Sequence, residues 1–593
     1  MKTRQSLVNL ITRLWMHIEI RRRWQFSVLL ILMIFSSFAE IISIGAVLPF
    51  LSVLTSPGIL FSQPLIQPLI NILGLVSAEQ LLLPLTIIFG ITALFAGALR
   101  LLLLWGCSRL SFSTGADLSL DIYRRSLYQP YSVHISRNSS EVISAITSKT
   151  NTVIYSVLVP MLTLVSSFII LAGILILLLY VDPLIATIAF GGFSLIYLLI
   201  IKFTRKRLLI DGQCIARETT GVIKSLHEGL GGIRDVLIDG TQDTYSMIYK
   251  NADKPLRRAQ GSSFFISQSP RYLIEALGML LIASLAYFLA KQPYGIANAI
   301  PILGALALGA QRLLPQLQQA YSSWSSIRTA QSSLCDTLEL LDQSLPSFSS
   351  LQKSNGIKFQ ESIFLNNLCF KYSKKNPWVI KGLSLTIKKG SRIGFIGTTG
   401  CGKSTLLDIV MGLLQPTKGD LKIDGELITA SNSRSWQAHI AHVPQTIFLA
   451  DSTIEENIAF GVPVEKIDFS RVRLAAQQAN IEDTIESWPD KYKTFVGERG
   501  VRLSGGQRQR IGIARALYKQ ADVIIFDEAT SALDSDTEQA VMSAIESLSK
   551  NLTLLIVAHR LTTLKKCTHI VELAEGSIKR AGTYQQIVTL ING

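Results

Sequence analysis

Basic residues are missing from a long stretch near the start of the chain. No Lys or Arg occurs between Trp24 and Leu99, although the preceding 23 residues contain six. Charged residues form only 17% of the 593 residues, whereas hydrophobic residues form 48%. About 20 apolar residues suffice for one membrane-spanning helix, so this stretch can hold two spans with a loop between them. The scarcity of charge therefore favours a membrane protein over a soluble one.

The net charge of +15 would by itself be compatible with binding to nucleic acid. The bases, however, flank the apolar runs, as they do in the cytoplasmic loops of membrane proteins. No coiled coil of the kind found in DNA-repair and chromosome ATPases is evident. We therefore expect no nucleic-acid partner.

Cysteine is also scarce, and the six cysteines lie far apart without metal-binding spacing: Cys107, Cys214, Cys335, Cys369, Cys401 and Cys567. We expect reduced thiols and no disulfide. A cleavable signal peptide is not expected, because the first apolar run, from about Phe26 to Leu54, is too long for one and lacks a cleavage pattern.

Six long apolar segments precede residue 330. They predict membrane helices at about 24–54, 82–107, 153–181, 183–203, 264–290 and 296–318. The loops after the first, third and fifth segments contain one base, Lys291, whereas the two long loops are rich in Arg, Lys and Asp. Basic loops remain in the cytoplasm, so we predict both termini and both long loops there.

The long loops have helical patterns, so the membrane helices are expected to continue into the cytoplasm and to end in turns near Tyr131–Arg137 and Gly231–Asp239. Beyond the polar linker PSFSSLQKSNG, strand-like runs alternate with helical ones, as in an α/β domain. We predict an all-α transmembrane domain of six helices over 1–345, followed by an α/β P-loop ATPase domain over 346–593.

A phosphate-binding loop is predicted in SRIGFIGTTGCGKSTLLDIVMGLL, which has the pattern of a strand, a glycine turn and a helix. Gly397, Gly402, Lys403 and Ser404 have the required spacing. In such a loop the backbone N–H groups surround phosphates, the lysine reaches the terminal ones, and the serine hydroxyl ligates Mg²⁺. The alternative is an ordinary strand–turn–helix without a ligand.

A second element, DVIIFDEATSALD, is an apolar strand that ends in two acids. Asp527 is placed to hold Mg²⁺ through its water shell, and Glu528 to polarise the attacking water. The alternative for Glu528 is a solvated acid at the end of a strand.

From about residue 358 to the end, the sequence resembles the nucleotide-binding domain of the ATP-binding cassette (ABC) transporters. The preceding part resembles the six-span domain of the exporters in that family, so the resemblance covers nearly the whole chain. Besides the two elements above, it rests on CFKYS, AHVPQTIFL, TFVGERG, LSGGQ, SALD and IVAHRL, which occur in the family's order.

The resemblance implies roles for single residues. Tyr372 would stack on adenine, with Phe370 as the alternative, and Gln445 would sense Mg²⁺ and the membrane domain. Glu528 and His559 would be catalytic, with His559 as the switch at the γ-phosphate. The implied ATP-binding residues are Tyr372, Gly397, Thr398, Thr399, Gly400, Cys401, Gly402, Lys403, Ser404, Thr405, Gln445, Ser504, Gly505, Gly506, Gln507 and Asp534. The implied Mg²⁺ site comprises Ser404, Gln445 and Asp527.

The LSGGQ segment raises the question of why one chain has two glycine turns suited to anions. In the family this segment faces the P-loop of a second copy, where Ser504 and the glycine N–H groups contact the γ-phosphate of ATP. The chain has one membrane half and one ATPase half, so the resemblance implies a dimer. Its complete motifs favour a homodimer.

The expected function is that of an ATP-driven exporter or flippase in the bacterial inner membrane, with the ATPase domain in the cytoplasm. The segment FAEIISIGAVLPFLSVLTSP is similar to lipid-linked oligosaccharide flippases, which suggests an amphipathic, lipid-linked substrate and contact with membrane lipids. The alternatives are an exporter of another lipid, a drug or a peptide, an ATP-gated channel or regulator without transport, and a soluble nucleic-acid ATPase.

Ionisable residues within the predicted spans are candidates for contact with the substrate, because such residues are costly in a membrane. Arg100, Arg271, Glu275 and Arg312 are predicted in the cytoplasmic half, and Glu40 nearer the outer half. The hypothesis is that the three arginines accept an anionic head, such as the pyrophosphate of a lipid carrier. The alternative is that Glu275 pairs with Arg271 or Arg312 and merely ties helices together.

Overall fold

The computed structural model describes residues 6–46, 49–50, 53, 61, 67, 71, 74, 77–181, 183–290, 295–345, 356–528, 538–539, 541–543, 551–558 and 564–592. Among helical residues, the side chains of 295–312 and of several positions in 177–189 and 281–290 lie outside this description. The chain forms two compact units. The first comprises Met1–Gln129 and Arg137–Leu345, and the second comprises Pro130–Ser136 and Pro346–Gly593.

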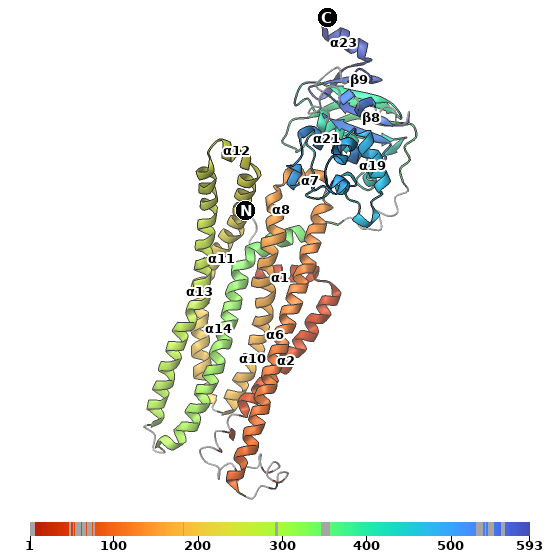
Figure 1. Ribbon diagram of the computed structural model, residues 1–593. Coiled ribbons are helices and arrows are strands. Elements are labelled where there is room, and N and C mark those ends of the chain that lie inside the picture. The colour runs from red at the N-terminus through yellow and green to blue at the C-terminus, as the bar shows by residue number, and fades with distance from the viewer. Residues whose placement is uncertain are drawn as a thin grey trace. The chain divides into compact units, whose positions relative to one another are not determined.

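The first unit is built from helices (Figure 1). In chain order these are α1 (Leu7–His17), α2 (Ile20–Gly45), η1 (Ala78–Leu81), α6 (Leu82–Leu127), α8 (Ser139–Ser144), η2 (Ala145–Lys149), α9 (Thr150–Val153), η3 (Ile154–Leu158), α10 (Val159–Val181), α11 (Pro183–Gly231), α12 (Ile233–Ile238), α13 (Gln242–Ala290) and α14 (Gly295–Leu341). Pro183 begins α11, a position where its missing N–H costs no helical hydrogen bond.

Four of these helices, α6, α11, α13 and α14, contain 46 to 49 residues each. At a rise of about 1.5 Å per residue they extend for roughly 70 Å, more than twice the thickness of a bilayer's hydrocarbon core, which is about 30 Å. These lengths agree with the expectation that the membrane helices continue well beyond the bilayer, which stays a prediction.

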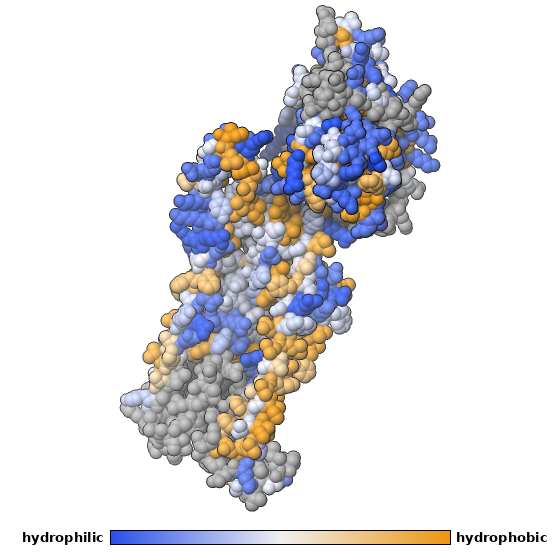
Figure 2. Space-filling view, viewed as in Figure 1, coloured by the Kyte–Doolittle hydropathy of each residue, from blue (hydrophilic) through white to orange (hydrophobic). Residues whose placement is uncertain are grey.

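Within the described residues, three helical stretches are long and apolar enough to cross a membrane: Ile20–Ser43, Leu82–Leu127 and Ser139–Ile176. They overlap the first three predicted spans. The other three predicted spans lie in α11, α13 and α14, where part of the side chains is not described. Apolar side chains gather on the surface of α2 and α6 (Figure 2), where Phe35, Phe38, Leu94 and Phe95 are more than half exposed. Such an apolar surface is suited to contact with lipid.

Close helix packing depends on small residues at defined positions. A Cβ added to Gly212 of α11 would lie 2.1 Å from the carbonyl oxygen of Thr329 in α14, so only glycine lets these backbones approach. One residue earlier, the buried Asp211 accepts a hydrogen bond of 2.7 Å from Ser262 of α13. Residues around position 211 of α11 therefore contact both α13 and α14.

Two features of the helices before residue 345 differ from the expectation drawn from the sequence. The chain reverses through short helices, α7 (Tyr131–Ser136) and α12, where turns were predicted. The path from Ser139 to Val181 also contains two π-helical segments, η2 and η3, rather than one regular span. A π turn inserts one residue into a helix and changes the direction of the side chains around it.

The second unit contains two sheets. The antiparallel sheet has the order β2-β1-β4-β5, with β1 (Ser362–Phe370), β2 (Ile380–Lys388), β4 (Lys418–Ile423) and β5 (Glu426–Leu427). The other sheet has the order β10-β9-β3-β8-β7-β6, with β3 (Arg392–Ile396), β6 (Ile440–Val443), β7 (Val523–Asp527), β8 (Thr553–Val557), β9 (His569–Ala574) and β10 (Ser577–Gly582). Within it β9, β3, β8, β7 and β6 run parallel, and β10 pairs antiparallel with β9.

Helices cover this sheet and complete the unit, namely α16 (Lys403–Val410), α17 (Ser433–Gln437), α18 (Ile454–Ile458), α19 (Phe469–Gln478), α20 (Glu482–Glu486), α21 (Gly505–Tyr518) and α23 (Tyr584–Asn592). Strands β7 and β8 are continuous apolar runs with almost every residue buried. Central parallel strands have this composition because helices cover both faces. The short helix α7 also belongs to this unit, although it lies more than 200 residues earlier in the chain.

Candidate nucleotide-binding site

The predicted ATP-binding segments follow the ends of parallel strands. The P-loop begins directly after β3 at Gly397, Gln445 follows β6 by two residues, and Glu528 directly follows β7. Parallel strands have their carboxyl ends at the same edge of a sheet, which is where ligands bind in open α/β sheets. The fold therefore brings together three segments that are up to 131 residues apart in the sequence, from Gly397 to Glu528.

The P-loop has a conformation that requires glycine. Gly397, Gly400 and Gly402 all have positive φ, of 148°, 83° and 104°. A Cβ on Gly397 would lie 2.3 Å from the carbonyl oxygen of Leu573, and one on Gly402 would lie 2.9 Å from Ile380 Cδ1. Gly402 precedes the first turn of α16, whose N–H groups and dipole attract an anion.

Lys403 is buried, and its ammonium group lies over the loop. It donates hydrogen bonds to the carbonyl oxygens of Gly397 at 2.8 Å and Thr398 at 3.2 Å. A positive charge held within the curve of a phosphate-binding turn is placed to pair with the terminal phosphates of a nucleotide.

Two oxygen ligands suited to Mg²⁺ meet at the start of α16 and the end of β7. Ser404 donates a hydrogen bond to Asp527. Burial raises the pKa of Asp527 above its ordinary value, the bond from Ser404 lowers it, and the charge of Glu528 raises it. A hydroxyl and a carboxylate are the hard ligands that Mg²⁺ takes when it also binds phosphates, so these residues fit the ion.

One acidic residue near this pair was not singled out from the sequence. Asp408 lies one helical turn after Ser404 on α16. Burial and the charge of Asp527 together raise the pKa of Asp408 to about 6. The spacing of four residues after Ser404 is the signal that would have placed it on the same helix face.

Gln445 and Glu528 contact one another directly. The Gln445 Nε2 atom donates a hydrogen bond of 2.7 Å to the Glu528 carboxylate. Glu528 has a positive φ of 53°, which is strained for a residue with a side chain, and its backbone N–H donates to the carbonyl of Val557. The backbone is thus bent sharply where the predicted water-activating carboxylate leaves the sheet.

The two aromatic candidates for adenine lie in different environments. Phe370 is buried at the end of β1, whereas Tyr372 is 45% exposed. Their rings pack edge to face with centroids 5.0 Å apart, and the Tyr372 hydroxyl lies 2.9 Å from the Thr405 hydroxyl. Tyr372 therefore has the exposed ring face that stacking requires, and it lies beside the P-loop helix.

The LSGGQ segment forms the start of α21. Ser504 is the N-cap, and its Oγ accepts from the Gln507 N–H at 3.2 Å. The Gln507 side chain in turn accepts from the Ser504 N–H at 2.9 Å, which completes a capping box. The N–H groups of Gly505 and Gly506 belong to the first turn and make no intrahelical bond. This arrangement leaves a serine hydroxyl and two glycine N–H groups at a helix end.

Two predicted site residues, His559 and Asp534, lie outside the described residues. Of the three arginines predicted in the membrane, Arg312 has a described backbone in α14 but no described side chain. Arg271 forms an ion pair of 2.7 Å with Glu275 of its own helix. Arg100 of α6 forms an ion pair with Glu40 of α2, with its Nε atom 2.8 Å from the carboxylate.

The Arg100–Glu40 pair corrects one expectation from the sequence. Glu40 was placed at a different depth from Arg100, and their contact shows that this was wrong. Hydropathy gives the approximate limits of a span, whereas the axial offset of two packed helices depends on their tilt and on residues outside the span. The observed partners agree with the rule that ionisable groups inside membrane helices pair.

Comparison with known proteins identifies the fold and the ATPase domain. Residues 380–531, which contain the P-loop, Gln445, LSGGQ and the acids after β7, match the family model described as ABC transporter. This segment of the chain is an ABC transporter domain. Over 97% of its length the chain matches 96% of the solved structure of a bacterial Atm1-family ABC exporter with ATP bound, with a TM-score of 0.79 and 22% identity. The predicted fold class, a helical membrane domain followed by an α/β ATPase domain, is thereby confirmed.

The chain is also similar in sequence to several named proteins. It is 40% identical over 254 residues, 43% of the chain, to an ATP-dependent lipid A-core flippase of Saccharophagus degradans, of which 42% is covered. It is 27% identical over 482 residues, 79% of the chain, to the lipid A-core flippase of Cupriavidus pinatubonensis, of which 80% is covered. It is 41% identical over 210 residues, 35% of the chain, to mouse ATP-binding cassette sub-family B member 5, of which 17% is covered. The first and third alignments thus span less than half of those relatives.

Proposed function

We propose that this protein is an ATP-driven flippase that moves a lipid with an anionic head from the cytoplasmic leaflet outward. The observation that carries the proposal is that the P-loop, Gln445 and Glu528 lie at one sheet edge of a chain whose other unit consists of membrane helices. Helices of this length can transmit a change at an ATPase domain to the bilayer. The similarity to proteins named lipid A-core flippases supports a lipid substrate.

In the proposed ATP site, the P-loop amides and Lys403 bind the phosphates, and Tyr372 stacks on the adenine. Ser404 and Asp527 would hold Mg²⁺, which neutralises charge on the phosphates when bound. Glu528 orients the attacking water, and Gln445 holds the Glu528 carboxylate in place through the bond of 2.7 Å. His559 and Asp534 complete the set by the family resemblance.

A homodimer is part of the proposal. Ser504, Gly505 and Gly506 would contact the γ-phosphate bound to a second copy, because α21 has an exposed anion-binding end. Exposed apolar side chains at the end of the α11–α13 hairpin also support contact with a second copy. Leu230 and three apolar residues of α12, Ile233, Leu237 and Ile238, are 45 to 75% exposed within the chain. An apolar surface at a polar helix end indicates a protein partner.

The proposed location is the bacterial inner membrane, with the ATPase domain and both termini in the cytoplasm. The apolar surface of α2 and α6 supports a multi-pass membrane protein. The asymmetric distribution of Lys and Arg among the loops supports the orientation.

The substrate proposal assigns the anionic head to Arg100, Arg271 and Arg312. Arg271 is suited to this role because its side chain is 59% exposed despite its pairing with Glu275, which is 40% exposed. Arg100 is also 40% exposed, whereas its partner Glu40 is 4% exposed. Both arginine side chains are thus partly accessible, and the planar fork of arginine matches phosphate oxygens.

The experiment compares each arginine with its carboxylate partner in reconstituted liposomes. The quantities are the ratio of lipid-stimulated to basal ATP hydrolysis and the movement of a labelled anionic lipid between leaflets. Arg271→Gln and Arg100→Gln are expected to lower both, whereas Glu275→Gln should not. If Arg271→Gln and Glu275→Gln have equal effects, the pair only ties turns of α13 together. If neither arginine substitution changes lipid movement, the assignment of the cargo site fails.

A further inference from the structure

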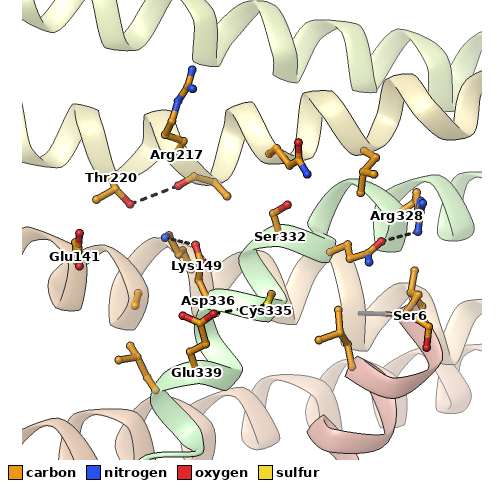
Figure 3. Close-up of a pocket in the computed structure, with 18 of the residues that line it drawn as sticks. Ser6, Glu141, Lys149, Arg217, Thr220, Arg328, Ser332, Cys335, Asp336 and Glu339 are labelled. Atoms are coloured by element: carbon orange, nitrogen blue, oxygen red, sulfur yellow. Dashed lines mark hydrogen bonds and ion pairs between the residues drawn. The ribbon is translucent and has the colours of Figure 1, made fainter. Parts of the chain in front are cut away.

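A large cavity lies in the helical unit, and its lining does not include the arginines just discussed. It has a volume of about 1420 Å³ and lies between α1, the segment from Arg137 to Lys149, α11 and the last third of α14 (Figure 3). This is larger than the roughly 300–1,000 Å³ of a typical small-molecule site. The space is therefore sufficient for a head group with several substituents.

The wall of the cavity is strongly basic. Eight bases and three acids line it: Arg137, Lys149, Lys202, Arg205, Lys206, Arg217, Lys224 and Arg328 against Glu141, Asp336 and Glu339. The difference is five positive charges. A concave surface lined by charges of one sign concentrates the potential inside it and attracts ligands of the opposite sign.

Lys149 fixes one side of this wall. It lies at the end of the π-helical segment η2, is 10% exposed, and its Nζ atom lies 2.6 Å from the Asp336 carboxylate of α14. Figure 3 shows the two side chains facing one another from these elements. The pair takes up one base and one acid, so the rest of the wall has seven bases and two acids and the same excess of five positive charges.

The opposite side is a row of bases on α11. Lys202, Arg205 and Lys206 lie at spacings of three and four residues, which places them on one helix face. Among the described residues none of the three forms an ion pair or a side-chain hydrogen bond, and all three are exposed. Three ammonium or guanidinium groups thus line one cavity without forming an ion pair with any described residue.

The same turn of α11 also has an apolar surface. Phe203 is 79% exposed and Leu199 is 47% exposed, directly beside the first of the bases. In the predicted topology the fourth span ends at about residue 203 on the cytoplasmic side, so these bases lie at the level of the inner head groups. A ligand with a phosphate and an apolar tail fits this boundary better than a soluble anion does.

We propose that this cavity binds the phosphate-bearing head group of an anionic lipid from the cytoplasmic leaflet, with Lys202, Arg205 and Lys206 as the phosphate contacts. The inference rests on the proposed flippase function and adds a loading site that the lipid occupies before it reaches the arginines within the membrane. The apolar chains would remain in the bilayer beside Phe203.

The test uses the purified full-length protein and the triple variant Lys202→Gln/Arg205→Gln/Lys206→Gln. The matched control is Lys250→Gln/Lys254→Gln/Arg258→Gln, which removes the same two lysines and one arginine from exposed positions of α13 outside the cavity. Binding of short-chain phosphatidic acid is measured at equilibrium, with short-chain phosphatidylcholine and inorganic pyrophosphate as the other two probes. Thermal unfolding and size-exclusion profiles show whether each variant is folded.

The cavity variant is expected to bind phosphatidic acid at least about tenfold more weakly, because each base near an anionic head group adds to the binding free energy. The control variant should remain within about twofold of the parent, since isolated surface charges contribute little. The charge-conserving variant Lys202→Arg/Lys206→Arg should retain binding. Equal loss in both triple variants, or unchanged binding in the cavity variant, would overturn the site.

The other probes identify the source of the phosphate. If pyrophosphate competes as strongly as phosphatidic acid, the ligand is a soluble anion and the lipid assignment is overturned. If phosphatidylcholine binds equally well, the bases do not select the ligand and the site fails. If phosphatidic acid binds to the cavity but no anionic lipid is moved between leaflets, the binding site stands and the proposed function fails. Normal lipid movement by the cavity variant would contradict the loading site and leave the function standing.

Discussion

Gln445 donates a hydrogen bond to Glu528 from its Nε2 atom to the carboxylate Oε2, across 2.7 Å. The bond connects the segment after β6 with the end of β7, two neighbouring strands of the parallel sheet. The backbone of Glu528 is strained by a positive φ of 53°. The same carboxylate is the one that we assign to the attacking water.

Replacing Glu528 with Gln should lower the rate of ATP hydrolysis by about a hundredfold or more, because a positioned general base contributes roughly 10²–10⁴ to a rate. Binding of ATP should persist, since the P-loop and Lys403 are unaltered. Release of phosphate and binding of a fluorescent ATP analogue measure the two properties separately. A near-normal hydrolysis rate in Glu528→Gln would show that another group orients the water.

Replacing Lys403 with Ala should weaken ATP binding at least about tenfold, because a charge-assisted contact to phosphate contributes roughly 1.5–3 kcal/mol. The substitution also removes the bonds to the carbonyls of Gly397 and Thr398. Lys381→Ala is the control, because Lys381 is an exposed lysine of β2. Nucleotide titration of both variants checks the expectation, and equal affinities would contradict the assignment of Lys403.

Replacing Gly212 with Ala should lower the unfolding temperature of the helical unit. The new Cβ would lie 2.1 Å from the Thr329 carbonyl oxygen, so α11 and α14 would have to move apart. Such overpacking typically costs about 1–3 kcal/mol. Gly261→Ala in α13 is the matched control, because nothing lies within 4 Å of its added Cβ. The control should be neutral or stabilising by up to about 1 kcal/mol. Similar unfolding temperatures for the two variants would argue against this packing.

Replacing Asp408 with Asn should change how stability depends on pH. Burial and the charge of Asp527 raise the pKa of Asp408 to about 6 in the folded protein, above about 3.9 in the unfolded chain. The folded state therefore binds the proton more tightly, and the free energy of unfolding decreases as pH rises from about 4 to 6. Asn cannot ionise, so the free energy of unfolding of the variant does not decrease in this way.

The Asp408→Asn variant should thus match the parent near pH 4 and be more stable above pH 6. After allowance for solvent screening of a half-buried group, we expect a gain of about 1–2 kcal/mol. Thermal unfolding without nucleotide at both pH values measures the difference. A gain of the same size at pH 4 and pH 7 would show that ionisation of Asp408 is not its cause.

The segments of the candidate ATP site could be located in the sequence because each of them is local. The P-loop and LSGGQ each depend on glycines within a few residues, and Glu528 follows an apolar strand directly. The Arg100–Glu40 pair could not be predicted, because it depends on the rotation and offset of two long helices. The basic cavity depends on α1, η2, α11 and α14 together and on a π turn that alters the direction of Lys149. Sequence periodicity contains no information on such an insertion.

The order of the strands has a consequence for how turnover is controlled. Strand β8 lies between β3 and β7, and β6 lies on the other side of β7. Hydrogen bonds join β3 to β8, β8 to β7 and β7 to β6. The P-loop, Gln445 and Glu528 are therefore attached to one stiff sheet and move together. In the proposed homodimer the contact with the γ-phosphate is completed by the Ser504 end of α21 from a second copy. Hydrolysis then requires two chains to associate, so specific activity should rise with protein concentration in dilute detergent solution until all chains are dimeric.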